Sequence, residues 1–107
     1  MRFILCFMIS LILMVSLSFA EQTTYEMALK AYAKKDFTEA VKLMKEYVLE
    51  SPSAKAYYLL GYASYKLDND KEAASYFNEA YLLDPEFNPQ SLIGEISLIE
   101  KRQKKAQ

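Results

Sequence analysis

The sequence predicts an all-α protein built from antiparallel helix-hairpin repeats, with five helices after an N-terminal signal segment. Two tracts, 40–52 and 73–85, both open on the alanine of a Glu-Ala pair and close on a proline. The chain has only 2 glycines, and its 3 prolines, Pro52, Pro85 and Pro89, stand at breaks between helix-forming stretches. Large apolar side chains recur at helical spacing between these breaks. A hairpin of this kind buries its apolar face only by stacking on a neighbour, so we expect a helical array.

Residues 1–20 are interpreted separately because they have the layout of a secretory signal peptide. Arg2 gives a positive start, residues 3–15 are almost entirely apolar, and small residues lie at Ser18 and Ala20 just before Glu21. We therefore predict cleavage after Ala20 and a periplasmic or secreted product that has no stable membrane insertion. A signal anchor is the alternative, although a membrane span needs about 20 apolar residues and serines dilute this segment.

Composition excludes several classes of function for residues 21–107, the predicted mature domain. This segment contains no cysteine and no histidine, so thiol and histidine chemistry are absent. Removal of Arg2 lowers the formal net charge of the chain from -1 to -2, which does not suggest a nucleic-acid partner. We also find no phosphate-binding loop, serine nucleophile motif or metal-ligand spacing. The sequence therefore predicts a protein that is not an enzyme, with no catalytic residue, no metal and no cofactor.

The first hairpin is predicted to consist of a helix over 24–34 and a second helix after Asp36. Thr23 and Glu26 have the spacing of a capping box, and Asp36 is an N-cap residue. Apolar side chains follow one stripe of each helix: Tyr25, Ala28, Leu29 and Tyr32 in the first, and Phe37, Ala40, Val41, Met44, Tyr47 and Val48 in the second.

The second hairpin is predicted over 53–67 and from Asn69 or Asp70 to Asp84. The first of these helices is apolar or amphipathic around most of its circumference: Tyr57, Tyr58, Leu59, Leu60, Tyr62 and Tyr65. Such a helix must contact neighbours on several sides. The other repeats the stripe of the first hairpin with Ala73, Tyr76, Phe77, Ala80 and Tyr81.

A last helix is predicted from Asn88, with Pro89 in its first turn, where the missing amide costs nothing. Its apolar side carries Leu92, Ile93, Ile96 and Ile99. This pattern suits a helix that closes one end of the array.

Residues 21–87 resemble the tetratricopeptide repeat family. Matching positions in the second repeat are Tyr57, Leu60, Gly61, Ala73, Phe77, Ala80 and Pro85, and those in the first are Ala28, Ala40, Met44, Tyr47 and Pro52. The resemblance implies a first repeat at 21–53, a second repeat at 54–87 and a capping helix at 88–105. We expect Gly61 to face Ala73, and Ala28 to face Ala40, so that paired helices approach closely while aromatic rings fill the gap to the next repeat.

The resemblance also implies where a partner binds, because first helices of successive repeats line a concave surface in this family. The corresponding residues here are Tyr25, Leu29, Tyr32, Lys55, Tyr58, Leu59, Tyr62, Tyr65 and Lys66. Tyrosine gives each position a large, rigid contact area with one hydroxyl. Tyr57 and Tyr76 are expected in the core, whereas Tyr58 and Tyr62 fit a core and a groove equally well.

Two hypotheses for function follow. The first is an exported adaptor that binds a peptide or helix of an envelope protein on the concave tyrosine surface. The alternative is a structural module that assembles into homo-oligomers through the apolar side of its C-terminal helix.

Overall fold

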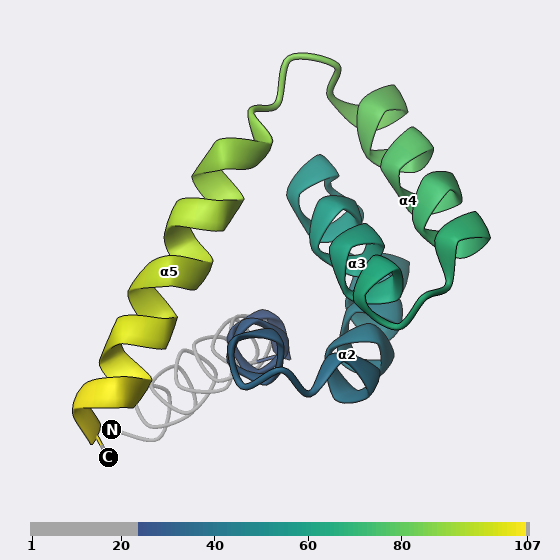
Figure 1. Ribbon diagram of the computed structural model, residues 1–107. Coiled ribbons are helices and arrows are strands. Elements are labelled where there is room, and N and C mark those ends of the chain that lie inside the picture. Colours follow the sequence, from purple (N-terminus) through teal and green to yellow (C-terminus); the bar gives the residue numbers. More distant parts are fainter. Residues whose placement is uncertain (1–23, 107) are drawn as a thin grey trace, which may run out of the picture.

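The computed structural model describes residues 24–106, and these residues are helical with no strand among them (Figure 1). A helix over 24–33 is followed by α2 (Phe37–Glu50), α3 (Ala54–Lys66), α4 (Asp70–Leu83) and α5 (Pro89–Ala106). The predicted all-α fold and helix order are confirmed. The predicted signal segment and the capping residue Thr23 lie outside the described residues.

Side chains cap three of the predicted helix starts. The oxygens of Asp36, Ser53 and Asn88 each accept a hydrogen bond from an amide in the first turn. The donor amides belong to Glu39 at 3.3 Å, Ala56 at 3.1 Å and Gln90 at 3.0 Å. Asn69 caps α4 without a side-chain hydrogen bond.

In both hairpins the first helix is joined to the second by the same left-handed turn. Lys35 has φ 68° and Asp68 has φ 64°. The amide after each of them donates to a carbonyl five residues back, from Asp36 to Ala31 at 2.9 Å and from Asn69 to Ser64 at 3.0 Å. This is the Schellman arrangement, which glycine usually provides. The two repeats therefore share backbone geometry even where their side chains differ.

α3 is the central helix and packs against α2 and α4. The main core contains fully or nearly fully buried side chains from the helix 24–33 and from α2, α3 and α5, including Leu29, Met44, Leu59, Leu60 and Leu92. Ala40 packs in a second cluster with Ala31 and Ala63, whereas Ala28 belongs to the main core. The expected pairing of Ala28 with Ala40 is thus replaced by an alanine contact among three helices.

Gly61 allows close packing of α3 on α4, and the side chain nearest to it is that of Phe77. A Cβ atom placed on Gly61 would lie 2.5 Å from Cε1 of Phe77, and the two next nearest atoms also belong to Phe77. Ala73 is buried but is not among these nearest neighbours. The ring of Phe77 therefore packs over Gly61 within its own repeat rather than only filling a gap to the next one.

α5 does not continue the array. After α4 the chain turns through residues 84–88, and α5 runs back along the other side of α3 (Figure 1). Within the described residues α5 contacts α3 and makes no close backbone contact with α4. Leu92 and Ile96 of α5 enter the main core. The outward side of α4 keeps large apolar side chains exposed: Tyr81, Leu82 and Leu83.

Candidate protein-binding face

The residues predicted to bind a partner come from the helix 24–33 and from α3, and we call them the first-helix face. They are Tyr25, Leu29, Tyr32, Lys55, Tyr58, Leu59, Tyr62, Tyr65 and Lys66. The structure divides this face into three parts. α5 covers the first part, and aromatic rings beside α5 form the second. The third part consists of Tyr65 and Lys66, which are exposed near the end of α3.

The covered part is buried by α5. Leu29 and Leu59 are 2% and 0% exposed and share the main core with Leu92 and Ile96. Neither leucine is accessible to a partner in this conformation. The family resemblance placed both leucines on a binding surface, but it did not indicate that another helix of the same chain lies over them.

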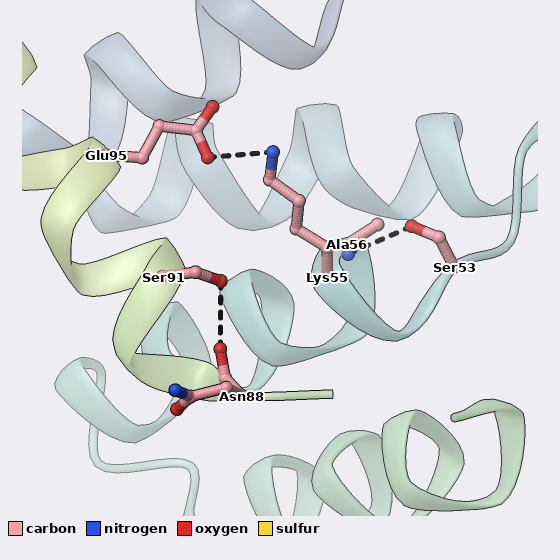
Figure 2. Close-up of polar contacts among 6 residues, drawn as sticks. All are labelled: Ser53, Lys55, Ala56, Asn88, Ser91 and Glu95. Carbon is pink, nitrogen blue, oxygen red and sulfur yellow. Dashed lines mark hydrogen bonds and ion pairs between the residues drawn. The ribbon is translucent and has the colours of Figure 1, made fainter. Parts of the chain in front are cut away.

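A polar contact borders the covered part. Lys55 Nζ lies 2.8 Å from Glu95 Oε2 on α5, as Figure 2 shows. The same ammonium lies 5.0 Å from the ring centre of Tyr25, and this ring packs at 5.5 Å against that of Tyr47. Lys55 thus joins α5 to the helix 24–33 through a charge and an aromatic face.

The hydroxyl of Tyr25 is buried, and no hydrogen-bond partner for it is found among the described residues. Burial, followed by the negative charge of Glu95 and the neighbouring Tyr47, raises the pKa of Tyr25 well above its ordinary value. This side chain is therefore neutral at physiological pH and acts through its ring.

The aromatic part beside α5 consists of Tyr32, Tyr58 and Tyr62, which we call the tyrosine row. The ring of Tyr58 stacks at 5.5 Å on Phe87 and at 6.3 Å on Tyr62. Phe77 lies behind both rings, at 6.0 Å from Tyr58 and 5.2 Å from Tyr62. Each tyrosine of the row is half-buried. Tyr58 and Tyr62 are therefore core and surface residues at once, which reconciles the two readings of the sequence.

Tyr32 is the member of the row from the helix 24–33, and its ring packs edge-on at 5.1 Å against Phe37. Burial mainly, with smaller contributions from Tyr62 and Glu100, raises the pKa of Tyr32, and burial followed by Tyr58 raises the pKa of Tyr62. Tyr32 and Tyr62 are therefore uncharged near neutral pH, and their hydroxyls can donate or accept hydrogen bonds. Tyr57 and Tyr76, expected in the core, pack together at 6.4 Å against the main cluster.

Residues 54–87, which form α3, α4 and the following turn, match the family model described as tetratricopeptide repeat. The second hairpin is therefore a tetratricopeptide repeat. The match covers the second hairpin, and the first hairpin repeats its left-handed closing turn. No curated protein and no solved structure matches the chain. Tetratricopeptide repeats are a non-catalytic fold that binds other proteins, which makes this chain a candidate interaction protein.

A second feature of this tetratricopeptide repeat protein is an open cleft between the helix 24–33 and α5. Its lining mixes apolar and charged side chains: Glu26, Leu29, Lys30, Glu95, Leu98, Ile99 and Arg102. Most of these residues were absent from the predicted site, because only the folded path of α5 brings them beside the first helix.

No set of three histidine, cysteine, aspartate or glutamate side chains in 24–106 is placed to hold a metal ion. No helix in that part of the tetratricopeptide repeat protein has the length and apolar character needed to span a membrane.

Proposed function

We propose that this protein is an exported tetratricopeptide repeat adaptor that binds a segment of an envelope protein along the tyrosine row. The tyrosine row is the observation that supports this assignment. The rings of Tyr58 and Tyr62 are half-buried against Phe77, Tyr58 also stacks on Phe87, and Tyr32 packs on Phe37. Burial raises the pKa of Tyr32 and of Tyr62, so these two hydroxyls carry no charge near neutral pH. Export rests on the signal-like sequence of residues 1–20.

Aromatic burial, not ion pairing, is the main source of affinity in this proposal. A rigid ring loses little conformational freedom on binding, and tyrosine is enriched among residues that dominate interface energies. Affinity should therefore be modest and should change little between low and physiological salt concentrations.

Self-assembly through α5 is the alternative, and the arrangement of α5 gives it less support. Leu92 and Ile96 are 0% and 7% exposed within their own chain, so the predicted oligomer surface would first have to separate from the core. We therefore place the adaptor function first.

The test is affinity capture from envelope extract with wild type and with the double variant Tyr58→Ala, Tyr62→Ala. We expect the variant to lose the captured partners, because it removes two rings of the row. Tyr81→Ala in α4 is the matched control and should retain them, since Tyr81 is 57% exposed and is not one of the rings of the row.

Helicity measured by circular dichroism must be retained for the comparison to count. Tyr62→Phe serves as a milder variant, since it keeps the ring on Phe77 and deletes only the hydroxyl. Identical partners bound by wild type and a folded double variant would remove the tyrosine row from the assignment.

A further inference from the structure

α5 lies where an external helix would bind a tetratricopeptide repeat. It crosses α3 on the side away from α4 and reaches the helix 24–33, so it covers part of the first-helix face (Figure 1). A helix could instead pack on the outer side of α4, but no described helix lies there, and Leu82 of α4 is 66% exposed. The chain therefore carries a resident helix on its own candidate binding face.

The contacts of α5 define a recognition pattern. Leu92 and Ile96 are buried against the face, and Ile99 packs at its edge. These positions are four and three residues apart, so they share one side of the helix. Glu95 lies on the adjoining side and pairs with Lys55 (Figure 2). The face thus recognises an amphipathic helix with apolar residues at these spacings and one carboxylate.

Among the described residues, the polar contacts of α5 with the rest of the chain are exposed to solvent. Lys55 and Glu95 keep 38% and 35% of their side chains exposed, and an ion pair with this exposure contributes little. Near the C-terminal end of α5, Gln103 Nε2 donates a hydrogen bond to the Lys30 carbonyl at 3.4 Å. Between these two contacts lies the open cleft, where Leu98 remains 57% exposed.

We propose that α5 is an intramolecular stand-in for a partner helix of the same pattern, and that such a helix binds by displacing α5 from the helix 24–33 and α3. This inference deepens the proposed adaptor function and rests on it in naming a protein partner. It adds that α5 limits the binding of the partner helix by competing for the same face. A tethered helix competes at an effective concentration on the order of millimolar, so a partner must bind the freed face more tightly than α5 does.

The experiment uses the purified chain and a fluorescent peptide of residues 89–106 as the probe, with binding followed by anisotropy. Ile96→Glu in the chain should release α5, because it places a charge in the core. We expect this variant to bind the peptide at least about 10-fold more tightly than wild type. If Ile96→Glu is not helical by circular dichroism, Glu95→Lys, which repels Lys55 from a surface position, replaces it.

A crosslink provides the opposite control. In a Cys6→Ser background, which removes the only cysteine, Lys30→Cys and Gln103→Cys are joined by a short bismaleimide. We expect the joined chain to lose peptide binding and the same chain before joining to behave as wild type. Crosslinks that join two chains instead would show that α5 lies on a second copy, and would overturn the proposal.

A charge exchange tests the recognition pattern. A peptide carrying Glu95→Lys should bind the released chain about 3- to 5-fold more weakly, and Lys55→Glu in the chain should restore it. Equal binding of the native peptide by wild type and the released variant would show that α5 does not block the face. Absence of binding by a folded released variant would also overturn the proposal. Capture of a partner through the tyrosine row is measured in a separate experiment. Failure of the displacement proposal therefore does not decide whether the protein is an adaptor.

Discussion

The ring of Phe77 occupies the space that a side chain at Gly61 would need. A Cβ atom on Gly61 would lie 2.5 Å from Phe77 Cε1 and 2.7 Å from Cδ1. Real Cβ atoms do not approach a ring carbon this closely, so the ring would have to move. Tyr58 and Tyr62 pack against it at 6.0 Å and 5.2 Å between ring centres and limit that movement.

Gly61→Ala should therefore destabilise the protein. Overpacking costs about 1–3 kcal/mol, and the better helix propensity of alanine offsets up to about 1 kcal/mol of this loss. We expect the free energy of unfolding, measured by urea denaturation, to fall by about 1–2 kcal/mol. In a Phe77→Leu background the same substitution should cost less, because the ring is gone. An equal cost in both backgrounds would contradict the packing argument.

Gly94→Ala should have the opposite effect. A Cβ atom on Gly94 in α5 would meet no atom within 4 Å, so only helix propensity changes. We expect the free energy of unfolding to rise by about 0.5–1 kcal/mol. Comparing the two glycines thus distinguishes the effect of close packing on stability from the effect of helix propensity. A loss of stability in Gly94→Ala would indicate a contact that the structure does not contain.

Lys35→Gly should stabilise the first hairpin. Lys35 holds the left-handed conformation, with φ 68°, which is strained for a side chain with a Cβ atom by about 1 kcal/mol or more. Glycine removes the strain, although it also gains freedom in the unfolded chain. We expect a net rise of about 0.5 kcal/mol in the free energy of unfolding. Lys34→Gly is the control, since its backbone φ is not positive, and it should lower the stability.

Ser53→Ala should weaken the start of α3. The hydroxyl of Ser53 accepts a hydrogen bond from the Ala56 amide at 3.1 Å, and loss of such a cap costs about 1 kcal/mol. Asn69→Ala at the start of α4 is the matched control, because Asn69 makes no side-chain cap bond. We expect its effect on the urea midpoint to be clearly smaller, and equal effects would show that capping does not explain the difference.

Stability should decrease at alkaline pH because of buried tyrosines. The pKa values of Tyr25, Tyr32 and Tyr62 are raised in the folded chain, whereas an unfolded tyrosine has a pKa of about 10. Above about pH 10 the unfolded chain therefore binds fewer protons than the folded one, and the free energy of unfolding falls as pH rises. Below that pH all three are neutral in both states, and their contribution is constant.

Tyr25→Phe tests the largest of these effects. The change removes a buried hydroxyl that has no hydrogen-bond partner among the described residues, so stability at pH 7 should stay equal or rise by about 1 kcal/mol. The alkaline decrease should become shallower, which urea denaturation at pH 8 and pH 11 measures. Tyr65→Phe is the control, because Tyr65 is 58% exposed. A loss of stability in Tyr25→Phe would reveal a partner for the hydroxyl.

The sequence by itself determined the helices and where they begin. Asp36, Ser53 and Asn88 act as caps with their own local amides, and Pro52 and Pro85 cannot continue a helix. These signals act within a few residues, so no tertiary information is needed to read them. The residues of the second hairpin also resembled a tetratricopeptide repeat, and the family model matches the same residues, 54–87.

Only the tertiary structure decided which surfaces those helices cover. The apolar side of α5 could close the end of the array or fold back, and the turn at 84–88 directs it onto the first-helix face. That choice buries Leu29 and Leu59, pairs Lys55 with Glu95 and leaves the tyrosine row open. Likewise, the atoms nearest to a Cβ on Gly61 belong to the ring of Phe77. Periodicity gives the direction of a side chain around its own helix, whereas its neighbour depends on how separate helices cross.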